Sequence, residues 1–266
     1  MPGKWLSGKY LVVIGGTSGM GLSAALAFVR EGAKVVVVGR NDETRKLAAT
    51  QLGENGFAIT GDATNEQTAR MAISKCRDRF GGFDGLYHVA GGSGRKFGDG
   101  PLHELSLDGW QKTLDLNLTS LMLSNKAAVE YFTSNNKPGT ILNMGSVLGF
   151  SPSPKYFTTH AYAAAKSAII GFTKSIAAYY APHNIRINVI APALIETPMS
   201  KRAINDETIS TFLKNKQPLD GGRAGLPEDT DGVAVLLFSD YAKFITGQVI
   251  AVDGGWSITE GQYQNM

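Results

Sequence analysis

The chain has 266 residues, of which 43% are hydrophobic and 18% are charged, so it can bury a large core and is not typical of a disordered protein. Its 26 basic and 23 acidic residues give a net charge of +3, and no run of Lys and Arg exceeds two residues, which disfavours a nucleic-acid binder. A single cysteine excludes an internal disulfide framework and a cysteine-rich zinc site, and it fits a reducing compartment.

One stretch superficially resembles a targeting or membrane segment. Residues 10–29 carry no charge and follow Lys4 and Lys9. Four glycines between positions 15 and 21 interrupt the stretch. The apolar run at 11–14 is far shorter than the ~7–15 residues of a signal-peptide core or the ~20 residues of a membrane span. We expect a strand, a loop and a helix here, in a cytoplasmic protein without a membrane segment.

Short β-branched runs alternate along the chain with longer stretches that carry apolar residues at helical spacing. The runs predict seven strands, at 10–14, 34–38, 57–60, 85–89, 140–144, 185–190 and 248–252. The stretches predict helices at 19–30, 43–52, 65–79, 107–133, 162–180 and 229–240. Because the strands are apolar throughout, helices should cover both faces of a parallel sheet. We therefore predict an α/β fold of the Rossmann type, with a doubly wound, seven-stranded parallel sheet in a single domain spanning 1–266.

Residues 195–226 break this alternation. The segment is polar and helix-like, and it lies between the sixth and seventh predicted strands. Because ligands bind at the carboxyl ends of the strands in such sheets, an excursion that starts there can cover them. We expect a lid-like insertion.

The first predicted strand runs into a glycine-rich loop that opens a helix. Gly15, Gly19 and Gly21 have the spacing G-x-x-x-G-x-G. Glycine lets the backbone turn sharply and approach a ligand, and the N-terminus of the helix attracts a phosphate. The alternative is a glycine-rich turn that binds nothing. We predict a pyrophosphate site, with further cofactor contacts at Thr17, Ser18 and Met20.

The second predicted strand should end near the adenosine ribose of a dinucleotide. Arg40 stands 19 residues after Gly21, where an acidic residue would bind the ribose of NAD(H) and an Arg suits a 2′-phosphate. We therefore predict NADP(H), with NAD(H) possible if Arg40 is only a solvated loop charge. Asp62 and Ala63 follow the third strand and are predicted to lie at the adenine. The alternative role for Asp62 is to cap the helix from Asn65.

Tyr162 and Lys166 are spaced so that both side chains lie on one face of a predicted helix. A tyrosine has an ordinary pKa of ~10, which is too high for efficient proton transfer at neutral pH. A positive charge ~6 Å away, at an effective dielectric constant of ~20, is worth about 2.8 kcal/mol. That energy corresponds to a pKa lower by about two units. Such a phenol can exchange a proton with a carbonyl or alcohol oxygen.

With these residues the sequence resembles the short-chain dehydrogenase/reductase family, from about Leu6 to Trp256. Each motif alone is weak evidence, but all of them occur in the family's order, which makes the match specific. The resemblance extends to the 3-oxoacyl-[acyl-carrier-protein] reductase branch. The matching positions are Gly15, Gly19 and Gly21, then Ala90 and Gly91, then Asn117, Ser146, Tyr162 and Lys166, then 187–192, Thr197 and 252–255.

The resemblance implies a role for each position. Tyr162 is the proton donor in reduction and the base in oxidation, and Lys166 lowers its pKa and holds the nicotinamide ribose. Ser146 hydrogen-bonds the substrate oxygen and stabilises developing charge. Asn117 holds a water that relays protons from Lys166. Further cofactor contacts are implied at Ala90, Gly91, Pro192, Ala193, Ile195 and Thr197.

The chain departs from the family pattern at three points. Ile14 stands where the family usually has Thr, and His88-Val89 stand where it has Asn-Asn. Since the family's Thr hydroxyl helps to fix the segment after the fourth strand, we expect the two changes to form one compensated repacking. Ala193 replaces a common Gly and should narrow the nicotinamide pocket slightly.

Other side chains suggest a substrate pocket. We expect Arg95 and Lys96, after the fourth strand, either to meet an anionic substrate or acyl carrier protein or to be solvated surface charge. His160 could reach the pocket or serve as a loop or cap residue. No pair of histidines has metal-like i, i+4 spacing, so no metal site is predicted. An apolar substrate wall is expected from Leu148, Phe150, Phe157, Leu194 and Met199, with some of these side chains belonging simply to the core.

The sequence thus predicts an NADP(H)-dependent oxidoreductase that moves hydride between nicotinamide and a carbonyl or secondary alcohol. The first expected substrate is a 3-oxoacyl thioester. A sugar, polyol or steroid dehydrogenase is the enzymatic alternative, and a non-catalytic nucleotide-binding sensor is the other. Small residues at 163–165 and 168 permit close helix packing, and with the family's habits they predict a homotetramer, or failing that a dimer.

Overall fold

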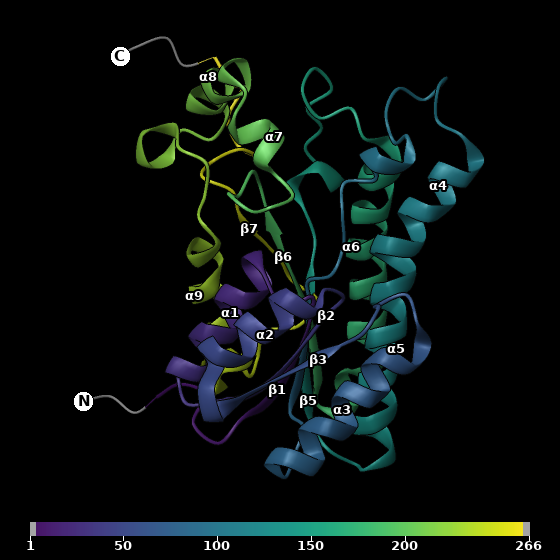
Figure 1. The fold of residues 1–266 in the computed structure, drawn as a ribbon, viewed down its shortest axis with the longest axis vertical. Coiled ribbons are helices and arrows are strands. Elements are labelled where there is room, and N and C mark those ends of the chain that lie inside the picture. The colour runs from purple at the N-terminus through teal and green to yellow at the C-terminus, as the bar shows by residue number, and fades with distance from the viewer. Residues whose placement is uncertain (1–3, 263–266) are drawn as a thin grey trace.

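The computed structural model describes residues 4–262 and contains one parallel sheet with helices on both faces (Figure 1). The strands follow the order β3-β2-β1-β4-β5-β6-β7. Their bounds are β1 Tyr10–Ile14, β2 Lys34–Gly39, β3 Gly56–Thr60, β4 Gly85–His88, β5 Gly139–Met144, β6 Ile185–Pro192 and β7 Val249–Val252. The predicted α/β class and seven-stranded, doubly wound sheet are confirmed, and the strand ends move by at most two residues.

Alternate residues of each strand face opposite layers, which is why whole strands are apolar. On one side Val13 and Val37 pack against α1 (Gly19–Arg30), α2 (Asp42–Leu52) and α9 (Asp231–Phe238). On the other side Val12 and Val36 pack against α3 (Glu66–Phe80), α5 (Ser120–Ser134) and α6 (His160–Tyr180). Figure 1 shows α1, α2 and α9 on one side of the strands and α3, α5 and α6 on the other.

The long helix predicted at 107–133 contains an interruption. It consists of α4 (Leu107–Leu114), a wider π-helical turn at Asp115–Thr119, and α5. The π turn was not predicted, since its apolar spacing differs little from that of an ordinary helix. Single π turns often mark functional sites. This one carries Asn117, which the resemblance singled out.

The segment 195–226 runs beyond the sheet. It contains α7 (Lys201–Ile204) and α8 (Glu207–Lys216), which Figure 1 places beyond the ends of β6 and β7. A bridge between Ile195 and Gly225 closes its base. No helix within residues 4–262 is long and apolar enough to cross a membrane.

Candidate active site

The site lies where the strand order reverses, between β1 and β4. Ile14 pairs with Val38 of β2 on one side and with His88 of β4 on the other. The chain leaves neighbouring strands in opposite directions at such a point, which opens a crevice at their carboxyl ends. The backbone N–H groups of Val89 and Ala90 both donate to the carbonyl of Ile14, and so bring the loop after β4 against the glycine loop.

The glycine loop uses backbone conformations and spaces that suit glycine. Gly15 has a φ of +85°, and a Cβ there would lie 2.6 Å from the backbone nitrogen of Ala90. A Cβ on Gly21 would overlap the carbonyl of Gly15. Ser18 precedes α1 without a side-chain cap, and the first turn of α1 has no acidic residue. The free N–H groups of this turn can therefore bind an anion.

A cavity of about 380 Å³ adjoins this loop, and we call it the glycine-loop cavity. Arg40, after β2, and Asp62, after β3, also line it. Partial burial acts to raise the pKa of Asp62, but bonds from Thr64 and the charges of Arg40 and Lys96 hold it below its usual value. The predicted cofactor residues that line this cavity are Gly15, Thr17, Ser18, Gly19, Met20, Arg40, Asp62, Ala63, Ala90, Gly91 and Thr197.

The structure does not support the alternative role of Asp62 as a helix cap. Asn65 caps α3, and its side chain accepts a bond from the N–H of Gln67 at 2.9 Å. The Asp62 carboxylate instead accepts bonds from the N–H and the hydroxyl of Thr64, at 2.9 and 2.8 Å. Asp62 therefore shapes the loop before α3, where it borders the cavity.

A second cavity, which we call the tyrosine cavity, has a volume of about 150 Å³ and shares Met20, Val89, Gly91, Thr197 and Met199 with the first. The two therefore adjoin. The predicted residues that line it are Met20, Gly91, Ser146, Tyr162, Lys166, Pro192, Ala193, Ile195 and Thr197. Of the predicted catalytic and cofactor-binding residues, Gly21 and Asn117 border neither cavity, because Gly21 packs beneath Gly15 and Asn117 bonds the loop after β4.

Tyr162 and Lys166 reach the tyrosine cavity from one face of α6, while Ser146 follows β5. The Lys166 ammonium donates to the carbonyl of Met144 at 2.7 Å and lies 5.5 Å from the centre of the Tyr162 ring. A Cβ on Gly149 would lie 2.9 Å from the backbone of Lys166, so the turn after Ser146 packs directly on α6. The predicted group of serine, tyrosine and lysine is thus gathered in one cavity.

The expected lowering of the Tyr162 pKa is not what the structure gives. Burial raises the pKa of Tyr162, and the bond with Ser146 opposes this only in part. Burial also lowers the pKa of Lys166 to about 7. The prediction assumed a fixed positive charge in a medium of moderate dielectric. Here desolvation disfavours the charged forms of both side chains and is the largest influence on each pKa.

Asn117 acts through the loop after β4. Its side-chain oxygen accepts from the N–H of Gly92 at 3.1 Å, and its amide donates to the carbonyls of Gly92 and Thr113, both at 2.9 Å. The side chain is fully buried. These bonds fasten the π turn to the loop at the crevice, so the side chain itself has no free hydrogen for a relay water.

His88 occupies the position of the family's Asn and forms a buried network of its own. Its Nδ1 lies 2.7 Å from the hydroxyl of Ser124, and its Nε2 lies 3.1 Å from the carbonyl of Ala90. Since a carbonyl only accepts, Nε2 carries the proton. Burial and the charge of Lys166 lower the pKa of His88 to about 3. Ile14, the partner of His88 in the neighbouring strand, faces the same layer of the core. The bond from His88 to the Ala90 carbonyl holds the loop after β4 in place.

Asp99 is an important residue that the sequence did not reveal. It lies in the loop after β4 and is 3% exposed. Its two carboxylate oxygens accept bonds from the N–H groups of Ala161 and Tyr162, both at 2.9 Å. A carboxylate at a helix N-terminus stabilises the helix. Asp99 thus fixes the turn of α6 that carries Tyr162.

The apolar wall was predicted nearly in full. Leu148, Phe157, Leu194 and Met199 line the tyrosine cavity, whereas Phe150 is 46% exposed and does not. Phe150 was a wrong prediction, because the turn that begins at Val147 directs it outward. The wall also includes Val147 and the buried Trp256, which were not predicted.

Two further expectations concern charged and metal-binding groups. Arg95 lines the tyrosine cavity and is joined there by Arg202, which was not predicted, whereas Lys96 borders neither cavity. His160 is exposed at the first position of α6 and does not line the cavity. Within residues 4–262, no group of three or more His, Cys, Asp and Glu side chains could hold a metal ion.

Known proteins share this arrangement of sequence and fold. Residues 15–257 match a family model described as enoyl-(acyl carrier protein) reductase. The 2,5-dichloro-2,5-cyclohexadiene-1,4-diol dehydrogenase of Sphingobium indicum is 33% identical over 95% of this chain and 98% of its own length. The 2-(S)-hydroxypropyl-CoM dehydrogenase 3 of Xanthobacter autotrophicus is 33% identical over 94% and 97%.

The fold agrees with a solved structure as well. A short-chain type dehydrogenase/reductase from Mycobacterium ulcerans has a TM-score of 0.86 and 29% sequence identity, covering 95% of this chain and 91% of that protein. Since a family model matches most of the chain and named dehydrogenases match nearly all of it, the chain belongs to the short-chain dehydrogenase/reductase family, whose members are oxidoreductases that use a nicotinamide cofactor.

Proposed function

We propose that the protein is an NADP(H)-dependent oxidoreductase that interconverts a ketone and a secondary alcohol. One observation carries this proposal: Ser146, Tyr162 and Lys166 line a cavity that adjoins the glycine-loop cavity. A nucleotide sensor needs the glycine-loop cavity and has no use for the tyrosine cavity. The presence of both, side by side, favours catalysis over sensing.

The residues around the glycine-loop cavity fit a dinucleotide. The loop leaves no room for a Cβ at Gly15 or Gly21, so the backbone can approach a pyrophosphate closely. The cavity extends from α1 to Arg40 and Asp62 after the next two strands, where an adenosine would lie. When bound, the cofactor would supply or accept a hydride at its nicotinamide, and Met20 and Thr197, which line both cavities, would help to hold it.

The chain's own side chains would hold and move the proton. In reduction, the Tyr162 hydroxyl donates its proton to the substrate oxygen, and in oxidation it takes the proton back. Because burial raises the pKa of Tyr162, the phenol is protonated at neutral pH, which suits it for donation. Ser146 is 6% exposed and would donate a second hydrogen bond to the same oxygen.

Arg40 supports NADP(H) over NAD(H). It borders the cavity beyond β2, where the adenosine ribose is expected, and its guanidinium would bind a 2′-phosphate. The test is a fluorescence titration of the protein with NADPH and NADH. We expect tighter binding of NADPH, and a loss of roughly 10- to 100-fold in Arg40→Gln, which removes charge-assisted bonds. Equal binding of both cofactors by the wild type would mean that Arg40 is only a solvated surface charge and does not bind a 2′-phosphate.

Two substrate classes are candidates. The resemblance to 3-oxoacyl reductases favours a 3-oxoacyl thioester, with an acyl carrier protein as a partner. The relatives are named for activities on a cyclohexadiene diol and on 2-hydroxypropyl-CoM, which favour oxidation of an alcohol on a functionalised small molecule. Steady-state rates with a β-keto thioester, a cyclic diol and a sugar separate the two. No turnover of the thioester would exclude the first class.

We also propose a homotetramer, with a dimer as the alternative. The support is the outer side of α6, where Ala168 is exposed and Gly171 has open space beside it, since small residues allow two helices to approach closely. Light scattering of the purified protein measures the assembly directly. A monomer would contradict this part of the proposal.

A further inference from the structure

The entrance to the tyrosine cavity carries two positive charges that the reaction proposed above does not use. Arg95 follows β4, and Arg202 belongs to α7 in the excursion over the sheet. Both residues line the cavity that holds Ser146, Tyr162 and Lys166. The rest of the lining is mostly apolar, including Leu148, Phe157, Leu194 and Trp256.

Neither guanidinium is neutralised by a carboxylate. The ion pairs formed by residues 4–262 include neither Arg95 nor Arg202. Asp99 acts on Arg95 electrostatically, but its two oxygens already accept the N–H groups at the start of α6. Burial lowers the pKa of Arg95, and the nearby charge of Arg202 lowers it further. Two like charges are therefore held near each other without a counter-ion among the described residues.

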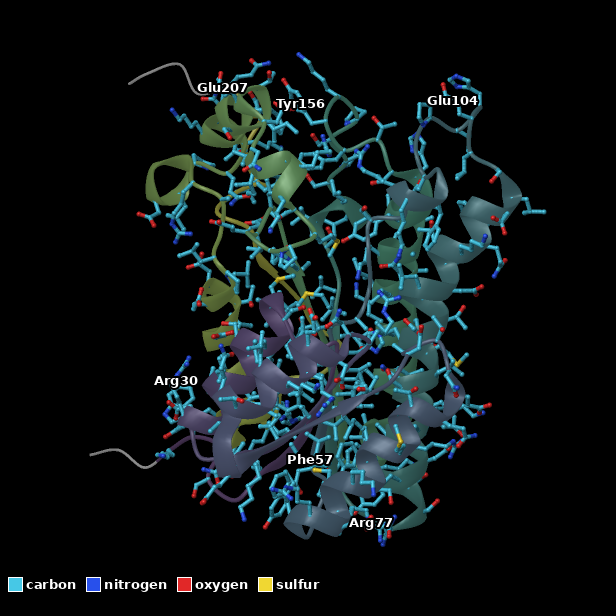
Figure 2. All side chains as sticks on the ribbon, viewed as in Figure 1. Arg30, Phe57, Arg77, Glu104, Tyr156 and Glu207 are labelled. Atoms are coloured by element: carbon cyan, nitrogen blue, oxygen red, sulfur yellow. The ribbon has the colours of Figure 1, made fainter. Side chains whose placement is uncertain are left out.

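Arg95 is also oriented. Its guanidinium donates to the carbonyl of Tyr156 at 3.3 Å, which ties the loop after β4 to the loop before α6. The ring of Tyr156 packs against Phe212 of α8 in a tilted arrangement, with the ring centres 4.8 Å apart, and Figure 2 shows Tyr156 close to that helix, where Glu207 is labelled. The loop after β4 and the excursion thus meet at the cavity entrance, and each of them contributes one arginine.

From this geometry we propose that Arg95 and Arg202 form an oxyanion subsite, so that the preferred substrate is a small ketone or secondary alcohol bearing a carboxylate or a similar oxyanion. The anion would accept bonds from the two guanidinium groups at the entrance. The apolar wall would hold the carbon chain, and the reacting oxygen would lie between Ser146 and Tyr162. This assignment rests on the proposed oxidoreductase function and names the substrate class of the same site.

The first test compares 4-oxopentanoate with its methyl ester, because the two share one ketone and differ in charge. Binding to the NADPH-loaded protein is measured by calorimetry, and turnover is measured by NADPH consumption. We expect the acid to bind at least tenfold more tightly than the ester. In Arg95→Gln/Arg202→Gln, the acid should lose roughly 10- to 100-fold in affinity, while the ester changes less than twofold.

A charge-matched control is Lys201→Gln/Lys214→Gln. Both lysines are exposed on the excursion and border neither cavity. The control removes the same net charge, so it should leave the preference for the acid unchanged. Equal losses in the two double variants would reduce the effect to long-range attraction and overturn the subsite. Thermal melts of each variant check that it is folded.

Other outcomes also decide the question. Equal binding of acid and ester, or no binding of either, would overturn the subsite. Acetoacetyl-CoA is compared with the neutral N-acetylcysteamine thioester, because phosphates of CoA are a second source of oxyanions. If the two arginines favoured acetoacetyl-CoA over the neutral thioester but did not favour the acid over its methyl ester, the bound anion would be a phosphate of CoA. That result would overturn the proposal that the substrate itself carries a carboxylate. If the acid binds as expected but no ketone or alcohol is turned over, the subsite stands and the proposed oxidoreductase function fails.

Discussion

The two adjoining cavities are built in different ways. The glycine-loop cavity is lined mainly by the turns that follow the neighbouring strands β1 to β4, and five of its lining residues are glycines, where the backbone itself borders the space. The tyrosine cavity is shaped by side chains that come from the loop after β4, the end of β5, α6, the end of β6, the excursion and the C-terminal segment. A backbone-built site tolerates few changes at its glycines and accepts one kind of ligand. A site assembled from many side chains can change its substrate while the fold persists.

The largest expected effect comes from the tyrosine cavity. Tyr162→Phe removes the hydroxyl and keeps the ring, so it removes the proposed proton donor without opening a void. We expect kcat to fall roughly 10³-fold, within the usual range for general acid–base catalysis. NADPH affinity, measured by fluorescence, should change less than twofold.

Tyr156→Phe provides the matched control, because it removes a hydroxyl from the neighbouring loop while Tyr156 does not line the cavity. Its kcat should stay near that of the wild type. If Tyr162→Phe retained its activity, the phenol would not be the proton donor. The tyrosine cavity would then differ from the glycine-loop cavity in its lining but not in supplying a catalytic proton.

The next effect tests the backbone-built cavity. In Gly15→Ala, the new methyl group would lie 2.6 Å from the Ala90 nitrogen, at a φ of +85°. We expect the Kd for NADPH to rise roughly 10- to 100-fold, because the loop must shift away from its ligand. Fluorescence titration of the purified variant measures this change.

Gly98→Ala separates steric overlap from backbone strain. Gly98 has almost the same φ, +83°, but a Cβ placed there would meet no atom within 4 Å. Both variants therefore incur strain of about 1–2 kcal/mol, and only Gly15→Ala displaces the loop. Similar NADPH affinities in the two variants would mean that backbone strain, rather than contact of the new methyl group with Ala90, is the reason why position 15 needs glycine.

Much of this molecule could be predicted from its sequence, for local reasons. The strands are continuous apolar runs, and Gly15, Gly19 and Gly21 mark the loop by their spacing. The positions of Ser146, Tyr162 and Lys166 followed from the family resemblance, and the structure brings them to one cavity. In each case the signal lies within a few neighbouring residues or in a known motif.

The rest depends on contacts between distant and irregular segments. Asp99 binds the N–H groups of residues more than sixty positions away, from a loop without a periodic pattern. Arg202 reaches the cavity because the excursion packs over it. The pKa of Tyr162 was misjudged, since its direction depends on how deeply α6 is buried. Spacing along the chain carries no information on any of these.

Asp99 gives a prediction that concerns both cavities. It lies in the loop after β4, which contacts the glycine loop at its beginning and the start of α6 at Asp99. Asp99→Ala removes the two bonds at the start of α6. We expect the free energy of unfolding to fall by about 1–2 kcal/mol, the usual cost of a lost cap. We also expect kcat to fall roughly tenfold, since small displacements of a reacting group reduce the rate.

Asn65→Ala separates the two effects, because Asn65 caps the remote helix α3. It should lower stability, measured by urea unfolding, and leave kcat unchanged. Asp99→Asn keeps an acceptor and should recover most of the lost rate. A fall in stability with no change in kcat would make Asp99 a purely structural cap, with no part in positioning Tyr162.

The last effect concerns stability alone, at the contact between α1 and α9. Asp231, at the start of α9, accepts a bond at 2.7 Å from Ser23 of α1, the helix that follows the glycine loop. Its other oxygen is buried without a partner among the described residues, as is the hydroxyl of Tyr87. Burial raises the pKa of Asp231 from 3.8 to about 6, although Ser23 and Arg30 act against this. The folded state therefore stabilises the protonated carboxyl more than the unfolded chain does.

Stability should consequently depend on pH in a definite direction. A carboxyl with a raised pKa in the folded state contributes fully below pH ~4 and loses that contribution as the pH rises through about 6. The loss is on the order of 1–3 kcal/mol.

In Asp231→Asn the amide cannot ionise, so this fall between pH 4 and 6 should disappear, and the variant should be at least as stable as the wild type at pH 8. Urea unfolding across pH 4–8 measures both curves, with the exposed Glu54→Gln as control. Parallel curves for wild type and Asp231→Asn would contradict a raised pKa for Asp231. Both carboxylate oxygens would then have hydrogen-bond partners, as those of Asp99 do at the start of α6.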